Sequence, residues 1–221
     1  MHRPHRGPVR LRSAKGRRAS STRWLRRQLK DPYVHGAQEA GYRSRAAYKL
    51  LEIDRKFGLL RRGRRVLDLG AAPGGWVQVA VEKGCRVVGL DLVPIAPIEG
   101  AVLLEGDVFD PAAVEQARQA LGGPADVVLS DLAAAATGQR SLDRLRAEAL
   151  AEAVLDLLPD VLRPGGALVL KLLHGVESTI APLARPRFAT IKLVRPDATR
   201  RESSEIYLVG LDHRPARSDA D

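Results

Sequence analysis

The chain has 221 residues, of which 45% are hydrophobic and 28% charged, and this is the composition of an ordinary soluble globular domain. Its net charge of +10 is uneven, because residues 1–30 carry 11 basic and no acidic residues while the remaining 191 positions are close to neutral. No apolar run approaches the roughly 20 residues of a membrane span, and one cysteine, Cys85, excludes a disulfide framework and a multi-thiolate zinc site. We therefore expect a cytoplasmic protein with no membrane and no metal partner.

Residues 1–19 are expected to form a disordered basic arm. They hold seven basic side chains and only Met1, Val9 and Leu11 as sizeable apolar ones, interrupted by prolines and glycines, so an amphipathic transit-peptide helix is disfavoured. The arm is then either a solvated tail or a polyanion-binding segment whose arginines release counterions from phosphates. In the second case it adds salt-dependent affinity but little chemistry.

A helix is expected after Ser44, which can cap it. Its apolar side chains share one face: Ala47, Leu50, Leu51 and Phe57. Three basic side chains are left to contact a polyanion: Arg43, Arg45 and Lys49. Residues 1–65 have a net charge of +16 and residues 66–221 one of −6. This division predicts a basic face for nucleic acid beside an acid-lined pocket for a cationic cofactor.

From residue 66 onward, β-branched or leucine-rich runs alternate with helical patterns, which is typical of a parallel sheet wrapped by helices. Seven strands are expected: Arg65–Leu69, Arg86–Leu90, Ala101–Leu104, Asp126–Ser130, Ala167–Leu173, Phe188–Val194 and Ile206–Leu211. Helices are expected over Gly75–Lys83, Ala112–Leu121, Leu142–Val161 and Val176–Leu183. Pro164-Gly165-Gly166 is expected to form a turn before the fifth strand. No linker divides the pattern, so we predict one α/β domain over residues 20–211 and a tail over 212–221.

The segment Val66–Trp76 combines a buried strand, a glycine-rich turn and a helix start, which is where Rossmann-type sheets bind nucleotides. It is not a Gly-x-Gly-x-x-Gly loop, because Ala72 and Pro73 occupy the middle of the phosphate cradle. Asp68, at the end of the strand, would also repel phosphates. A ligand with an ammonium or a sulfonium group is a better match, and S-adenosylmethionine has both.

Two further acids follow neighbouring strands. Asp91 ends the second strand about 20 residues beyond the turn, where an acid accepts hydrogen bonds from ribose hydroxyls. Asp107 follows the third strand, where it can bind an adenine amino group. The alternative is a glycine turn with helix-capping acids. Three acids at strand ends favour binding of S-adenosylmethionine.

The chain has 29 arginines and only seven lysines, and lysine, unlike arginine, can lose its proton when buried. Lys171 lies near the carboxyl end of the fifth strand, and Asp131 ends the fourth, at the edge where active sites of open α/β sheets lie. Lys49 on the upstream helix and Glu205 before the last strand are further candidates. Each has a structural alternative. Lys171 could be a snorkelling or salt-bridged lysine and Asp131 a helix cap or loop acid. Lys49 could be a solvated charge, and Glu205 could simply pair with an arginine.

These segments resemble the bacterial FtsJ/RrmJ ribosomal RNA methyltransferases from about Ser20 to Leu211. The resemblance rests on five stretches: Ser21–Leu25, Arg43–Leu50, Asp68–Trp76, Ser130–Asp131 and Arg195–Asp197. It implies a Rossmann-like methyltransferase fold with a seven-stranded, mostly parallel sheet flanked by helices. It also implies that a methyl group is transferred from S-adenosylmethionine to a ribose 2′-hydroxyl.

The resemblance also assigns roles to residues. The family's catalytic Lys-Asp-Lys-Glu set falls on Lys49, Asp131, Lys171 and Glu205. Its cofactor contacts fall on Gly74, Trp76, Asp91, Asp107 and Asp131. Bacterial members methylate a uridine in the peptidyl-transferase A-loop of large-subunit (23S) rRNA within the assembled 50S subunit, which makes these the implied partners. We expect the protein to be a monomer.

The chain departs from the family in two loops. The family typically has Asp-Met-Ala-Pro-Asn where this chain has Asp131-Leu132-Ala133-Ala134-Ala135. An aromatic residue and a glutamine after the fifth-strand lysine are replaced by Leu173 and His174. The four catalytic residue types are retained, so the departures concern loop geometry and the fit of the nucleotide.

Other functions fit parts of the sequence. The same methyl group could go to another RNA, such as tRNA. A nicotinamide-dependent oxidoreductase shares the fold class, but its phosphate loop and its Tyr-x-x-x-Lys pair are missing. A non-catalytic RNA-binding factor would keep the basic arm and need neither Lys171 nor Asp131. Within methyl transfer, Lys171 is either a base that takes the hydroxyl proton or a cation that stabilises the developing alkoxide.

Overall fold

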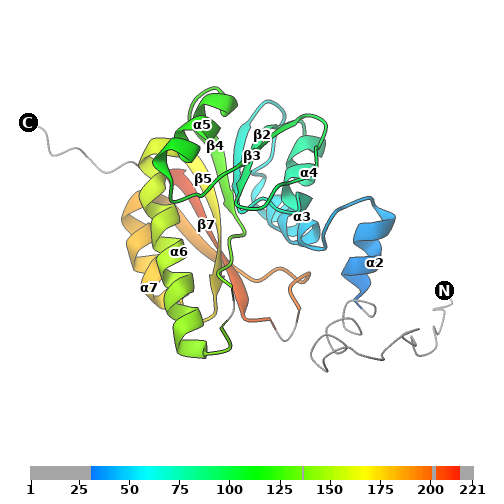
Figure 1. The fold of residues 1–221 in the computed structure, drawn as a ribbon. Coiled ribbons are helices and arrows are strands. Elements are labelled where there is room, and N and C mark those ends of the chain that lie inside the picture. The colour runs from blue at the N-terminus through cyan, green and yellow to red at the C-terminus, as the bar shows by residue number, and fades with distance from the viewer. Residues whose placement is uncertain (1–30, 136, 201–202, 215–221) are drawn as a thin grey trace, which may run out of the picture.

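The computed structural model describes residues 31–135, 137–200 and 203–214, so the basic arm predicted over residues 1–19 lies outside the described residues. Seven strands form one sheet: β1 (Arg65–Leu69), β2 (Arg86–Asp91), β3 (Ala101–Glu105), β4 (Ala125–Ser130), β5 (Leu162–Leu173), β6 (Phe188–Val194) and β7 (Glu205–His213). The helices are α2 (Pro32–Glu39), α3 (Ala46–Phe57), α4 (Gly75–Glu82), α5 (Pro111–Leu121), α6 (Arg140–Val161) and α7 (Glu177–Ala184), with a 3₁₀ turn η1 (Arg185–Arg187). Helices α5, α6 and α7 lie on one face of the sheet, and α3 and α4 on the other (Figure 1).

The strand order is β3-β2-β1-β4-β5-β7-β6, and every neighbouring pair is parallel except those that involve β7. This confirms the predicted seven-stranded, mostly parallel sheet. The order reverses between β1 and β4, where the chain first moves outward to β3 and then returns to the middle. Ligands of open α/β sheets bind at the carboxyl edge beside such a reversal. The carboxyl ends of β1, β2 and β4 are therefore the place to look for a site.

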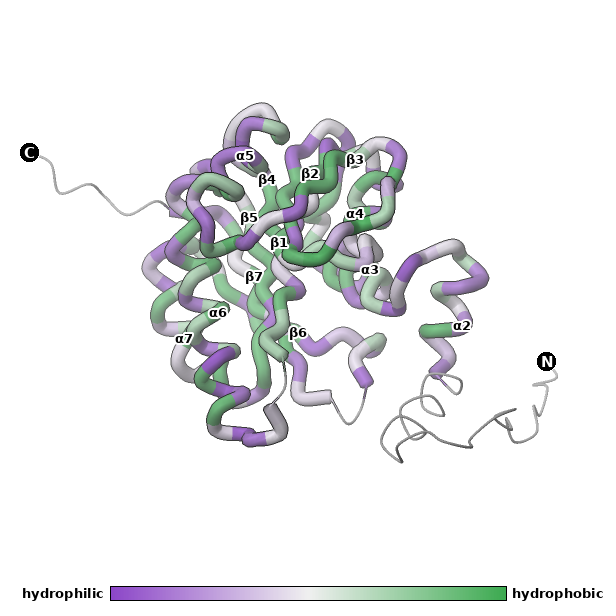
Figure 2. The backbone as a smooth tube through the Cα atoms, in the orientation of Figure 1, coloured by the Kyte–Doolittle hydropathy of each residue, from purple (hydrophilic) through white to green (hydrophobic). Residues whose placement is uncertain are grey.

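Two apolar layers hold the sheet between its helices, and Figure 2 shows the hydrophobic strands at the centre of the molecule. Along β5, Leu168, Leu170 and Leu172 pack in the layer shared with α5, α6 and α7. Val169 packs in the layer shared with α3 and α4. Because successive strand residues point to opposite faces, Lys171 lies on the same face as Val169, toward α3.

The N-terminal part of the fold differs from the prediction in two ways. Helix α2 was not predicted, and the Asp31 side chain caps it by accepting a hydrogen bond from the Tyr33 amide at 3.0 Å. Ser44 does not cap α3, because that helix begins at Ala46 and Arg45 occupies the cap position. The Ser44 hydroxyl instead packs against Gly75, where an added Cβ would lie 2.4 Å from it.

Pro164-Gly165-Gly166 does not precede β5 as a separate turn, because the strand already begins at Leu162. Ala125 of β4 pairs with Leu162 of β5, and the next pair is Val127 with Ala167. β5 therefore has extra residues between these two pairs, and they bulge out of the ladder. Gly165 has a φ of +72°, a conformation that glycine adopts without strain. The sequence signal for a turn was therefore real, but the structure uses it as a bulge inside the strand.

Candidate active site

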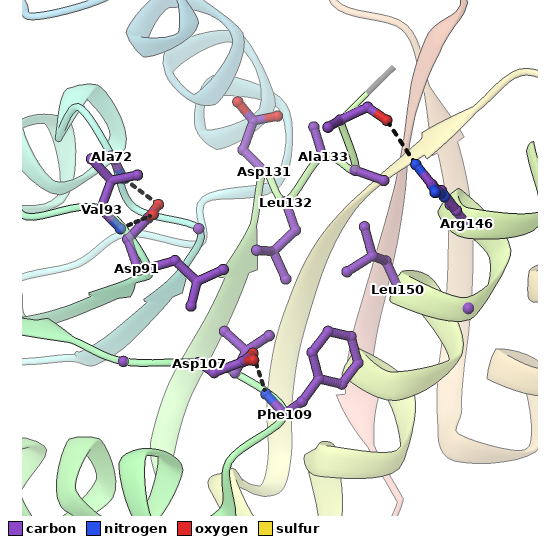
Figure 3. A pocket seen from close by; sticks show the side chains of 17 residues that line it. Ala72, Asp91, Val93, Asp107, Phe109, Asp131, Leu132, Ala133, Arg146 and Leu150 are labelled. Carbon is purple, nitrogen blue, oxygen red and sulfur yellow. Dashed lines mark hydrogen bonds between the residues drawn. The ribbon is translucent and has the colours of Figure 1, made fainter. Parts of the chain in front are cut away.

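A cavity of about 610 Å³ opens at the carboxyl ends of the strands around the reversal point (Figure 3). Three of the predicted cofactor residues line it together: Asp91 after β2, Asp107 after β3 and Asp131 after β4. Its apolar wall includes Phe109 and, from α6, Leu150. The cavity thus combines carboxylates with an apolar surface, which suits a ligand that carries both positive charge and an aromatic ring system.

Asp91 fixes the glycine-rich turn against the end of β2. One of its carboxylate oxygens accepts a hydrogen bond from the Ala72 amide at 2.8 Å and the other from the Val93 amide at 2.9 Å (Figure 3). Asp107 accepts one from the Phe109 amide at 2.9 Å. A carboxylate has about four lone-pair sites, so both acids can still accept hydrogen bonds from ligand hydroxyl or amino groups.

Gly74 and Trp76 do not line this cavity. Gly74 has a φ of +108°, and an added Cβ would lie 2.6 Å from Ile98 Cδ1, so the turn passes close to the β2–β3 connection. The Trp76 ring is buried, its N–H donates to the Ala46 carbonyl at 2.8 Å, and its centroid lies 5.8 Å from that of Tyr207. Their predicted role as cofactor contacts stays a prediction.

The Arg43 guanidinium ties the glycine-rich turn to the β2–β3 connection. It donates to the Pro73 carbonyl at 3.2 Å, to Ala96 at 2.6 Å and to Pro97 at 2.7 Å. Backbone carbonyls of two loops thus use three of the five N–H donors of Arg43, and its contact with a polyanion stays a prediction. Arg43 holds the turn from which the cofactor cavity begins.

Arg43→Lys is expected to raise the Kd for S-adenosylmethionine about tenfold while leaving RNA affinity and its salt dependence unchanged. A lysine keeps the charge, but its single nitrogen cannot serve three separated carbonyls as the planar guanidinium does. Isothermal titration of the cofactor and RNA binding over a salt series would measure both effects. Normal cofactor affinity with a shallower salt slope would instead show that Arg43 contacts phosphate.

Arg45 is also paired inside the protein. Its Nε lies 3.2 Å from an Asp31 carboxylate oxygen, and Arg200 Nε lies 2.8 Å from the same oxygen. Arg45 donates as well to the Ala198 carbonyl. Two arginines thus share one carboxylate and retain one net positive charge beside the β6–β7 connection. The sequence analysis left Arg45 for a polyanion, whereas in the structure its side chain contacts Asp31 and the Ala198 carbonyl.

Asp68, within β1, is a buried acid. It is 1% exposed, and neither of its carboxylate oxygens has a hydrogen-bond partner among the described residues. Burial, together with the negative charges of Asp131 and Asp91, raises the pKa of Asp68 well above its ordinary value. Because ionising an acid without a partner beside two others is costly, burial here favours the protonated form of Asp68.

Asp68→Asn is expected to stabilise the cofactor-free protein above pH 7 by about 2 kcal/mol, a rise in Tm of roughly 4–8 °C. In the wild type the folded state binds the Asp68 proton more tightly than the unfolded chain, so stability falls as pH rises above the ordinary pKa of 3.8. The variant lacks this fall. Thermal unfolding at pH 5 and pH 8 measures it, and parallel pH curves for the two proteins would contradict it.

The four predicted catalytic residues lie together on the face of the sheet toward α3. In the antiparallel β5–β7 pair, Lys171 is opposite Tyr207 and Leu173 is opposite Glu205. Since residues two apart on a strand share a face, Glu205 joins Lys171 there. Asp131 directly follows Ser130, which pairs with Leu170, the residue before Lys171. Lys49 reaches the group from α3.

The charges form two ion pairs. Lys49 Nζ lies 2.6 Å from Glu205 Oε2, and Lys171 Nζ lies 3.1 Å from Asp131 Oδ1 and also donates to the Asp131 carbonyl. Burial alone raises the pKa of Glu205, but the charge and hydrogen bond of Lys49 outweigh it and hold this pKa below its ordinary value. Glu205 is therefore an ionised partner and not a proton donor.

Tyr207 joins the two ion pairs, and the sequence analysis missed it. Its hydroxyl donates to Asp131 Oδ1 at 3.0 Å and accepts from Lys49 Nζ at 3.1 Å. Burial, reinforced by Asp131, raises the pKa of Tyr207 well above its ordinary value, so the phenol stays protonated and can donate. The available signal was its position two residues after Glu205, on the same face of a predicted strand.

His174 does not join this group. Its side chain is 77% exposed, and its Nδ1 lies 3.0 Å from Glu177 Oε1 at the start of α7. Among the described residues, no three His, Cys, Asp or Glu side chains are grouped as metal ligands. In the same part of the chain, no helix is long and apolar enough to cross a membrane.

A model of the FtsJ-like methyltransferase family matches residues 42–213. The chain belongs to this family. Ribosomal RNA large subunit methyltransferase E of Acidiphilium cryptum is 51% identical over 215 residues, which cover 96% of each chain. The protein of the same name from Rhizorhabdus wittichii is 50% identical over 222 residues, covering 97% of this chain and 96% of that one. Membership confirms the enzyme class and the methyl donor that the sequence predicted.

Solved structures agree with the fold of this FtsJ-like methyltransferase. A crystal structure described as a ribosomal RNA methyltransferase from Plasmodium falciparum has a TM-score of 0.70 at 26% identity, covering 78% of this chain and 98% of that one. The fibrillarin of Aeropyrum pernix, which binds S-adenosyl-L-methionine in its crystal, has a TM-score of 0.55 at 19% identity and covers 77% of this chain and 75% of that one. The second likeness concerns the fold alone.

Proposed function

We propose that this protein methylates a ribose 2′-hydroxyl of large-subunit ribosomal RNA. The observation that carries the proposal is the pairing of two lysines with two carboxylates around Tyr207, next to the cavity lined by Asp91, Asp107 and Asp131. The names of the relatives at about 50% identity support the RNA class. The basic N-terminal third supports a polyanionic partner.

The residues present fit S-adenosylmethionine. The carboxylates of Asp91, Asp107 and Asp131, which line the cavity, favour a cation over a phosphate. We expect Asp91 to accept hydrogen bonds from ribose hydroxyls and Asp107 to accept one from an adenine amino group, in the cavity that Phe109 and Leu150 also line. When bound, the cofactor supplies an electrophilic methyl group on a sulfonium.

Lys171 is the residue that we propose acts on the 2′-oxygen. Its side chain is 10% exposed and lies against two oxygen acceptors of Asp131, which are contacts that an ammonium group makes as a donor. In this form Lys171 stabilises the negative charge that develops on the 2′-oxygen, and the proton is then lost to water. Asp131 and Tyr207 hold Lys171 in place, while Lys49 adds a second positive charge. Positioning supplies the rest of the rate enhancement.

At a finer level, we propose the A-loop uridine of 23S rRNA in the assembled 50S subunit as the target, acted on by a cytoplasmic monomer. The resemblance to the family supports the uridine and the assembled subunit, and the names of the relatives support the large-subunit RNA. Labelled S-adenosylmethionine should be offered with naked rRNA, with assembled large subunits lacking the modification and with tRNA, and the modified nucleoside then mapped. Label in one A-loop uridine, and only with subunits, is expected. Label found in tRNA alone would overturn the substrate assignment.

A further inference from the structure

A second cavity of about 180 Å³ lies beside the first, toward α6. The loop residues Leu132, Ala133 and Ala134 line both cavities and therefore form the wall between them. Lys171 lines the second cavity, and on the far side lie small side chains of α6, including Ala147. The space is thus bounded by the cofactor site on one side and by the reactive lysine at the end of β5.

Three polar residues line this cavity, Asp143, Lys171 and Ser130, and Ser130 is the last residue of β4. It is 0% exposed, and its hydroxyl has no hydrogen-bond partner among the described residues. A buried hydroxyl without a partner is unfavourable, because it has lost its water without gaining another bond. Ser130 also points to the α6 face of the sheet, since Val128, two residues earlier, packs in that layer. The cavity therefore offers an unused donor and acceptor inside an apolar wall.

We propose that this second cavity receives the nucleobase of the acceptor nucleotide. The inference rests on the proposed function, because the carbon that bears the 2′-hydroxyl is bonded directly to the carbon that bears the base. A ribose whose 2′-oxygen reaches Lys171 therefore places its base within a few ångströms of that lysine. The second cavity lies at the same strand ends, on the α6 side of the sheet, and Lys171 borders it where β5 ends, although the lysine side chain itself points toward α3.

Size and chemistry fit a base. Sites for drug-sized ligands measure about 300–1,000 Å³, so a space of about 180 Å³ suits a single ring system and excludes a whole nucleotide. The side chains of Leu132, Leu170 and Leu173 supply apolar contact for the ring. Base edges carry both N–H donors and carbonyl or ring-nitrogen acceptors, and the Ser130 hydroxyl can serve either.

Two of the departures from the family pattern lie in this cavity. Ala134 stands where the family has proline, and Leu173 stands where it has an aromatic residue, and both line the space. Both replacements leave a smaller or more flexible side chain beside the cavity. The fit of the base in this protein therefore depends on positions at which its sequence differs from its family.

Two substitutions test the assignment. Ser130→Ala removes an atom without a described protein partner, so it should not lower Tm, but it should raise KM for the RNA substrate about fivefold. Ala147→Leu fills the cavity and should raise this KM by more than about tenfold. Neither should change the Kd for S-adenosylmethionine. Ala153→Leu, the same change on the same helix away from both described cavities, is the control and should retain the wild-type KM.

The measurements are steady-state methylation of large-subunit RNA or subunits, cofactor titration calorimetry and thermal unfolding. Wild-type KM in both Ser130→Ala and Ala147→Leu would overturn the base assignment while the proposed function stands. A weakened cofactor Kd in both, with RNA KM unchanged, would show that the cavity belongs to the cofactor and would also overturn it. A wild-type protein that methylates no RNA would overturn the proposed function, and the base assignment with it.

Discussion

Replacing Lys171 with methionine is expected to lower kcat for methyl transfer by about 10³-fold, or ~4 kcal/mol in the barrier. Methionine has a similar length but no charge, so the 2′-oxygen loses the cation that faces it while the space stays filled. Asp131 keeps its hydrogen bond from Tyr207, so the loop holds its place and the Kd for S-adenosylmethionine should not change. Transfer of labelled methyl under saturating substrate measures kcat, and calorimetry measures the Kd.

The same position separates the two roles of Lys171. Lys171→Arg keeps the charge but removes any accessible neutral form, so a cationic role predicts partial activity and a base role predicts none. An arginine variant as inactive as the methionine variant would contradict the cationic role that we propose. Lys192→Met, on the exposed side of β6, is the matched control and should retain full activity.

Asp91→Asn is expected to raise the Kd for S-adenosylmethionine about 100-fold, or ~2.7 kcal/mol. The charged carboxylate accepts stronger hydrogen bonds than an amide, and it also holds the Ala72 and Val93 amides at the edge of the cavity. The amide can satisfy only one of these two donors, so the glycine-rich turn loosens as well. At saturating cofactor, kcat should return close to the wild-type value, because Asp91 does not touch the lysine group.

Cofactor titration calorimetry, followed by methylation at rising cofactor concentration, measures both parts of this prediction. Glu105→Gln is the control, since Glu105 pairs with Asp91 in the β2–β3 register but does not line the cavity. An unchanged Kd in Asp91→Asn would mean that Asp91 only braces the turn. A kcat that stays low at saturating cofactor would place Asp91 in the chemistry instead.

Local sequence patterns predicted most of the fold. β1 and β6 begin and end at the predicted residues, and the other strands differ mainly at their ends, because a hydrogen-bonded ladder extends wherever a neighbouring strand is available. β5 begins five residues early for this reason, with its glycines in a bulge against β4. Helix α2 was not predicted, although Asp31 as the capping residue and Pro32 at the first helical position are a local signal for a helix start.

The sequence by itself determined the residue types of the site and the strand ends on which they lie, because hydrophobic periodicity and glycine-rich turns are local properties. Only the tertiary structure decided which charges pair, that Tyr207 joins them, and that Arg43 and Arg45 make contacts within the protein. It also decided that Asp68 and Ser130 are buried without partners. These properties depend on distances between side chains that are remote in sequence. Burial and pairing set the strength of a charge or a hydrogen bond, so they had to come from the packed fold.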